Sequence, residues 1–173
     1  MIELKKTVAS LACRGLNGVV VSPHFSSVGV TLGALFKRCL KQGMFLAPSH
    51  WAAVSDSDPV DPILSPERLR KIAAYTVSVA EAKFWDELAA SDVEDSYKIW
   101  ISKAARLASA YDALLTRLNA KAVLIFQGYL LEDAVLRALA IKRGLKVISM
   151  ERTLREDRLL WDTVSGITVN LCE

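Results

Sequence analysis

Two stretches of the chain repeat the same alternation of apolar and polar positions. Each begins with a short apolar run, passes through a polar loop into a helical segment that stops at a glycine, and ends in a second short run. The two stretches are Val19–Leu46 and Ala122–Met150. Strand–helix–strand units with right-handed crossovers have parallel strands, so the pattern predicts an α/β fold with a Rossmann-like parallel sheet flanked by helices.

The pattern also sets the expected bounds of the elements in the two units. Strands are predicted at Val19–Val21, Met44–Leu46, Ala122–Phe126 and Leu145–Met150. Helices are predicted at Val28–Gln42 and Glu132–Arg143, with Gly43 and Gly144 as their stops. Outside the units we expect a first helix over Ile2–Cys13 and a half-buried strand over Gly166–Leu171.

Two long helices are expected between the two units. The first begins at Ser65-Pro66-Glu67, where serine caps, proline occupies the first turn and glutamate faces the positive end of the dipole, and it runs to about Ala90. The second spans about Val93 to Leu118. Trp85 and Trp100 are interpreted as packing anchors of these helices. Residues 47–64 form a long irregular loop, either a flap that touches a ligand or an insertion anchored by Trp51.

Composition narrows the class of protein. With 173 residues and 52% hydrophobic positions, the chain is expected to be one ordered domain spanning residues 1–173. It has no apolar run of membrane-spanning length, and Met1–Lys6 does not resemble the start of a signal peptide, so a cytoplasmic location is predicted. Three scattered cysteines, no CxxC and two histidines argue against a metal site.

The charge is small but uneven. The formal net charge is +3, and basic residues gather between Arg137 and Arg158. A solvated helix face and a phosphate-binding patch both explain this gathering. A basic surface with interleaved aromatic residues is absent, so no nucleic-acid partner is expected.

Candidate site residues follow the predicted strands, because ligands of open parallel sheets bind beyond the carboxyl ends of the strands. After the first strand come Ser22, His24, Ser26 and Ser27. The amino terminus of the following helix suits an anion, and His24 suits a general base near neutral pH. The alternative is that His24 only completes a turn.

Two further groups follow the later strands. Gln127, Gly128 and Tyr129 follow the third strand, where Gly128 permits close backbone approach and Gln127 suits sugar hydroxyls; a purely structural turn is the alternative. Glu151 and Arg152 follow the fourth strand, as a base and a phosphate ligand or as a salt-bridged pair. Asp162, Ser165 and Asn170 form a weaker group that suits turns.

The segment Ala122–Asn170 resembles a part of bacterial capsule polysaccharide biosynthesis proteins and related glycosyltransferases of the GT-B type. The resemblance rests on the strand Val123–Phe126 with its Gln-Gly turn, the helix with Ala134, Ala138, Ala140 and Gly144, and the pair Glu151-Arg152. The family commonly has asparagine where Gln127 stands, which puts the contact made by this turn in question. The resemblance covers about a third of the chain.

The resemblance implies an amino-terminal, acceptor-side lobe of a two-lobe transferase. Such an enzyme transfers sugar from a nucleotide-sugar donor to a surface-polysaccharide or lipid-linked acceptor, without a metal or other cofactor, in the cytoplasm or at the inner face of the membrane. His24 and Glu151 would be the catalytic candidates. Ser26, Ser27, Gln127, Gly128, Tyr129 and Arg152 would bind substrate. The second lobe, with most donor contacts, is not part of this sequence, so the chain alone is expected to be an incomplete enzyme.

Two other readings of the sequence remain. One is a Rossmann-like module that binds a nucleotide or sugar phosphate without catalysis. The other is a partner-binding domain that uses the two long helices, which an exposed apolar stripe within Leu69–Leu88 would favour. The sequence does not decide the donor, the acceptor or the oligomeric state.

Overall fold

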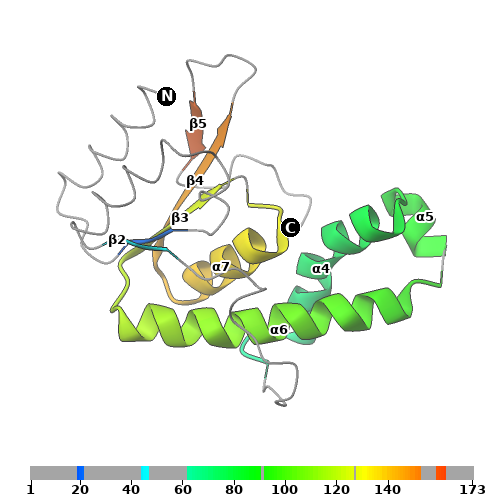
Figure 1. Ribbon diagram of the computed structural model, residues 1–173, viewed down its shortest axis with the longest axis horizontal. Coiled ribbons are helices and arrows are strands. Elements are labelled where there is room, and N and C mark those ends of the chain that lie inside the picture. Colours follow the sequence, from blue (N-terminus) through cyan, green and yellow to red (C-terminus); the bar gives the residue numbers. More distant parts are fainter. Residues whose placement is uncertain are drawn as a thin grey trace.

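The computed structural model describes residues 19–21, 44–46, 62–90, 92–126, 128–152 and 159–162, and it mixes helices with strands (Figure 1). In chain order the elements are β1 (Val19–Val21), β2 (Met44–Leu46), α4 (Pro66–Glu81), α5 (Trp85–Ala90), α6 (Glu94–Arg117), β3 (Ala122–Phe126), α7 (Leu131–Lys142), β4 (Lys146–Arg152) and β5 (Leu159–Asp162).

The strands form one sheet in the order β2-β1-β3-β4-β5. The first four strands are parallel, with Val19 opposite both Met44 and Ala122, and with Ala122 opposite Lys146. The strands predicted from the four apolar runs and their parallel direction are therefore confirmed. The fifth strand, β5, runs antiparallel to β4 and was not predicted.

The unit β3–α7–β4 follows its apolar pattern closely. In β3, Ala122 to Ile125 are at most 1% exposed, which explains why this strand reads as a continuous apolar run. Helix α7 ends where Gly144 adopts a φ of +66°, a conformation that glycine reaches without strain. The predicted helix stop at Gly144 is confirmed.

Helices α4 and α6 form a long hairpin. The predicted start of α4 is confirmed: the Arg68 backbone N–H donates to Ser65 Oγ at 3.2 Å, and Pro66 occupies the first turn. The predicted extension of this helix to Ala90 is wrong, because α4 ends at Glu81 and α5 is a separate helix. Trp100 of α6 packs as predicted, whereas the side chain of Trp85 lies outside the described residues.

The break between α4 and α5 is held by backbone and side-chain hydrogen bonds. Ala82 takes a left-handed conformation with φ of +51°, and the Lys83 N–H donates to the Ser78 carbonyl at 3.0 Å. Glu87 then accepts from the Phe84 N–H at 2.8 Å and so caps the start of α5. With no glycine or proline here, residue type gave no warning of the break.

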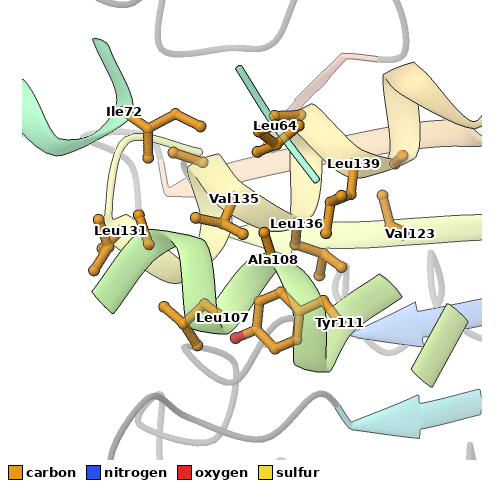
Figure 2. Packing of buried hydrophobic residues seen from close by; sticks show 14 of the residues in the cluster. Leu64, Ile72, Leu107, Ala108, Tyr111, Val123, Leu131, Val135, Leu136 and Leu139 are labelled. Carbon is orange, nitrogen blue, oxygen red and sulfur yellow. The ribbon is translucent and has the colours of Figure 1, made fainter. Parts of the chain in front are cut away.

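The main core lies between the sheet and the helical hairpin. Nine of the twelve residues of α7 are buried, because the helix packs on β3 and β4 on one side and on α4 and α6 on the other. Figure 2 shows Leu107, Ala108 and Tyr111 of α6 beside Leu136 of α7. A helix that is apolar on nearly every side is stable only in such an enclosed place.

A second, smaller cluster lies at the far end of the hairpin, where α4, α5 and the start of α6 extend away from the sheet (Figure 1). It consists of Ala73, Val77, Leu88, Val93 and Tyr97. Trp100 and Ile101 pack against both clusters and connect them. Outside this cluster, the guanidinium of Arg70 on α4 binds both carboxylate oxygens of Glu94 on α6, at 3.2 and 3.0 Å.

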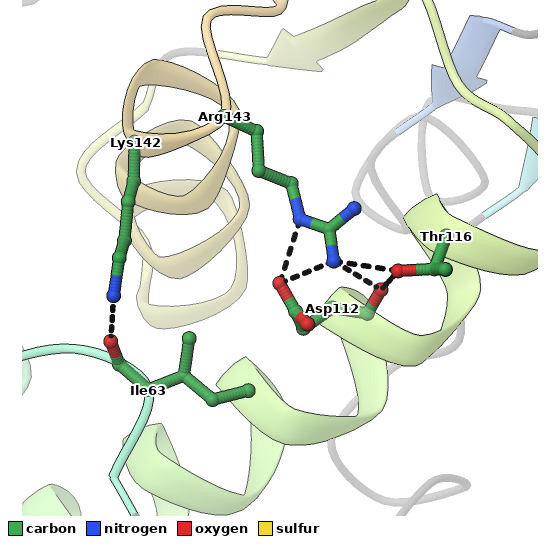
Figure 3. Close-up of polar contacts among 5 residues, drawn as sticks. All are labelled: Ile63, Asp112, Thr116, Lys142 and Arg143. Atoms are coloured by element: carbon green, nitrogen blue, oxygen red, sulfur yellow. Dashed lines mark hydrogen bonds and ion pairs between the residues drawn. The ribbon is translucent and has the colours of Figure 1, made fainter.

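Polar contacts fasten the carboxyl end of α7 to its neighbours (Figure 3). Arg143 donates from Nε to Asp112 Oδ1 at 2.7 Å and from a terminal nitrogen to Thr116 Oγ1 at 2.6 Å. The hydrogen bond from the Arg143 guanidinium to Asp112 raises the arginine pKa further above its ordinary value. Lys142 donates to the carbonyl oxygen of Ile63, which ties the segment before α4 to α7.

Several predictions concern residues outside the described part of the chain. These are the helices over Ile2–Cys13 and Val28–Gln42, the strand over Gly166–Leu171, the three cysteines, both histidines and most of the irregular loop over residues 47–64. In the described ranges, every helix is too short or too polar to cross a lipid bilayer. The same ranges contain no cluster of three or more His, Cys, Asp or Glu side chains suited to a metal ion.

Candidate functional site

The strand order reverses between β1 and β3. From β1 the chain goes to β2 on one side, and it later enters β3 on the other side of β1. Connections that leave neighbouring strands in opposite directions open a crevice beyond the carboxyl ends of those strands, and such crevices bind ligands. A crevice of this kind is expected beyond Val21 and Phe126, the last residues of β1 and β3.

The turn after β3 contributes Gly128 and Tyr129 to this edge. Gly128 has a φ of +105°, which strains any residue with a side chain. The methyl group of an alanine at this position would also lie 3.4 Å from Ile125 Cδ1 and 4.0 Å from Arg137 Cδ. Gly128 is therefore needed for the turn, and the aliphatic part of the half-buried Arg137 side chain lies near it.

A tyrosine that the sequence analysis did not select completes an aromatic corner here. The ring of Tyr75 on α4 lies against that of Tyr129, with centroids 4.8 Å apart and planes tilted by 60°. Both residues are half-buried. The contact makes α4 a wall of the region beyond β3. Tyr75 stands within the helical pattern of α4, so its sequence context gave no sign of this role.

Two buried carboxylates lie in the first turn of α7, just past the turn. Glu132 is 5% exposed and Asp133 is fully buried. Burial, followed by the negative charges of Glu132 and Asp133, raises the pKa of the Tyr111 phenol well above its ordinary value. Tyr111 therefore stays protonated and remains a hydrogen-bond donor inside the core.

The start of α7 carries acidic residues at a position where a helix can bind an anion. A helix amino terminus ordinarily attracts phosphate through its backbone N–H groups and its dipole. Here the acidic residues of the helix itself supply negative charge at that end. The side chains of Glu132 and Asp133 are both buried, so they do not present their carboxylates to a ligand at this edge.

Ser149 of β4, the strand next to β3, lies near this edge of the sheet. Ser149 is 1% exposed, lies opposite Ile125 in the register, and its Oγ accepts and donates no hydrogen bond among the described residues. Burying a hydroxyl group without a hydrogen bond costs free energy of folding. A new hydrogen bond to Ser149 would therefore be favourable.

Glu151 and Arg152 occupy a different position from the predicted one. They were expected just past the strand, but they are its last two residues and pair with Leu160 and Leu159 of β5. The pair extends beyond the last β3–β4 partners, Phe126 and Met150. The antiparallel ladder to β5 explains the extension, because it continues the strand through residues whose charge indicated a loop.

The remaining predicted residues are not brought together by the described structure. Ser22, His24, Ser26, Ser27 and Gln127 lie outside the described residues, as do the side chains of Glu151 and Arg152. In sequence, His24 follows the last residue of β1 by three positions and Gln127 directly follows β3. Asp162 is the last residue of β5, while Ser165 and Asn170 are outside the described ranges.

Comparison with known protein families, with curated proteins and with solved structures found no match.

Proposed function

We propose that the chain is a Rossmann-like, acceptor-side lobe of a bacterial GT-B glycosyltransferase that acts in surface-polysaccharide synthesis. The observation that carries the proposal is the reversal of strand order between β1 and β3. Because β1 and β3 are adjacent in the sheet, the segments that follow them begin at neighbouring strand ends. Both segments contain residues suited to sugar binding.

The aromatic corner after β3 supports a sugar ligand at this edge. Tyr75 and Tyr129 are half-buried aromatic rings in contact, and such rings suit the apolar face of a sugar. In the proposed roles Gln127, Gly128 and Tyr129 shape the sugar site, with Ser26 and Ser27 as further ligands. Arg152 would bind a phosphate of the donor farther along the edge.

The proposed reaction needs a base on the acceptor side. The acceptor hydroxyl oxygen forms a bond to the anomeric carbon of the donor sugar, the bond to the nucleotide diphosphate breaks, and the hydroxyl proton passes to the base. His24 and Glu151 are the proposed bases. The nucleotide diphosphate leaves with the electron pair of the broken bond.

The test has two readouts, because a binding module would share the site but not the reaction. Release of nucleotide diphosphate from a panel of nucleotide sugars, measured with the full protein encoded by the gene, reports transfer. NMR chemical-shift changes of Gly128 and Tyr129 on titration with sugars and nucleotide sugars report binding. Tyr129→Ala should weaken binding about tenfold or more, and Ile99→Ser, an exposed position on α6, should not.

The outcomes separate the candidates. Binding with turnover that His24→Ala or Glu151→Gln abolishes supports the transferase. Binding without turnover by the full protein supports the non-catalytic module. Shifts that avoid the β3–α7 turn with every sugar would rule out this edge as the site.

A further inference from the structure

The end of the helical hairpin carries an acidic surface with exposed apolar side chains. Residues 81–95 contain six acidic residues and one basic residue. Phe84 is 77% exposed and Val79 is 63% exposed, although each is large and apolar. Leu69, Ile72 and Val77 of α4 are buried, so the exposed side chains do not form a stripe along α4.

Part of this negative charge is not neutralised locally. Glu94 binds Arg70 and Asp95 binds Lys98 at 2.8 Å. Within the described ranges, Asp86 and Asp92 are exposed and take part in no ion pair. We call the surface of Val79, Phe84, Asp86 and Asp92 the acidic tip.

A surface of the opposite character lies at the other end of α6. Ile141 is 51% exposed in the last turn of α7. Exposed cations lie at the ends of the elements that meet here: Arg117 at the end of α6, Lys121 before β3, Lys142 at the end of α7 and Lys146 at the start of β4. The backbone N–H of Lys146 donates to the Lys121 carbonyl, so these strand starts are adjacent. We call this surface the basic end.

We propose that two copies of this chain associate side by side and antiparallel, with the acidic tip of each on the basic end of the other. Phe84 packs on Ile141 of the second copy, and Asp86 and Asp92 face its lysines. Both surfaces combine exposed apolar side chains with a predominance of charges of one sign, and the signs are opposite.

The length of α6 separates the two surfaces, so that two copies can satisfy both contacts at once. Its 24 residues separate the two surfaces by about 36 Å at the rise of an α-helix. Two antiparallel copies therefore make the same contact twice around a twofold axis, and no surface is left over for a third copy. The basic end lies at the amino edge of the sheet, so the dimer leaves the crevice at the carboxyl edge open.

Sedimentation velocity across a micromolar to millimolar range tests the dimer. We expect a monomer–dimer equilibrium that weakens as salt rises, because exposed charges are screened. Phe84→Ser should weaken the dimer about tenfold or more, and Asp86→Lys and Lys146→Glu about threefold to tenfold each. Ile99→Ser removes another exposed apolar side chain of α6 and is the matched control, with no expected change.

A charge exchange decides whether the two surfaces meet. A chain with both Asp86→Lys and Lys146→Glu should dimerise better than either single variant, because the charges are again opposite. Circular dichroism checks that each variant is folded. A monomer at all concentrations overturns the proposal, even if a basic peptide of another protein binds the acidic tip. A dimer whose affinity is unchanged by Phe84→Ser and by the charge exchange also overturns the proposal.

Discussion

Helix α7 and the tip of the α4–α6 hairpin are built from similar residues but differ in how they are covered. Helix α7 is enclosed by the sheet and the hairpin, and its core members Leu136 and Leu139 are fully buried. The tip has only the small cluster around Val77 and Leu88, while Phe84 next to it is mostly exposed. The difference shows that an apolar residue becomes core only where layers meet on both sides of its helix.

The same contrast applies to charge. The carboxylates of α7 are inside the molecule, whereas those of the tip face solvent. Buried charge is maintained only by specific partners and is therefore expected where function requires it, while exposed charge is free to serve association. This contrast agrees with our proposals of ligand binding near α7 and of contact between copies at the tip.

The largest expected effect comes from the enclosed helix. Leu136→Ala should lower the free energy of unfolding by about 2–5 kcal/mol, since it leaves a cavity where layers pack on both sides. Urea denaturation followed by circular dichroism measures the loss. Ile141→Ala on the same helix is the control, because Ile141 is 51% exposed and should cost no more than about 0.5 kcal/mol. Equal losses at the two positions would contradict the enclosed packing of α7.

Leu88→Ala gives the counterpart at the tip. We expect a smaller global loss, about 1–2 kcal/mol, because Leu88 is buried by a single small cluster. Amide hydrogen exchange should become faster in α5 and in the first turn of α6 but not in α7, since the tip opens locally. Uniformly faster exchange would mean that the tip and the main core unfold as one unit.

A smaller effect, of opposite sign, is expected at the break between α4 and α5. Ala82 has a left-handed conformation that a side chain disfavours, so Ala82→Gly should stabilise the chain by about 0.5–1 kcal/mol. Thermal unfolding measures the gain, and Ala74→Gly inside α4 should show a loss instead. A loss at both positions would show that the left-handed turn is not maintained in solution.

The smallest effect concerns the ion pair that joins α4 to α6. The hydrogen bond from Arg70 lowers the pKa of Glu94 below its ordinary value, so the unfolded chain binds the proton more readily than the folded one. The stabilisation by this ion pair is present when the pH is above the pKa that Glu94 has in the unfolded chain. It disappears as the pH falls through the pKa that Glu94 has in the folded chain. The melting temperature of the native chain should thus drop more steeply below about pH 4.5 than that of Glu94→Gln. Parallel profiles would exclude a contribution from this pair.

The sequence predicted β3 and α7 well, because Ala122–Ile125 and most of α7 are buried and their sequences are largely apolar. The stop at Gly144 was predicted because glycine takes its positive φ without strain. The sequence did not predict β5 or the last residues of β4, since their pairing depends on a partner strand and not on local residue type. It also missed the break at Ala82, where the Lys83 N–H donates to the Ser78 carbonyl and the Ser78 hydroxyl donates to the Lys83 carbonyl, without a glycine or proline to mark the break.

The candidate site was predicted less completely than the fold. Gly128 and Tyr129 could be selected because strand ends are readable from the apolar pattern. Tyr75 could not, since its contact with Tyr129 joins segments more than fifty residues apart. Glu132 and Asp133 resemble an ordinary acidic first turn, and their burial follows from how α7 is enclosed.

The pairing of β1 with β3 also affects the order in which the parts of the chain fold. Val19 pairs with Ala122, and the complete α4–α6 hairpin lies between them in sequence. Closing so long a segment is entropically slow, whereas β3, α7 and β4 meet through short connections. We expect pulse-labelled amides of β3 and β4 to be protected before those of β1. The ligand crevice would then form last in folding, and a bound ligand would report that both halves of the chain have joined.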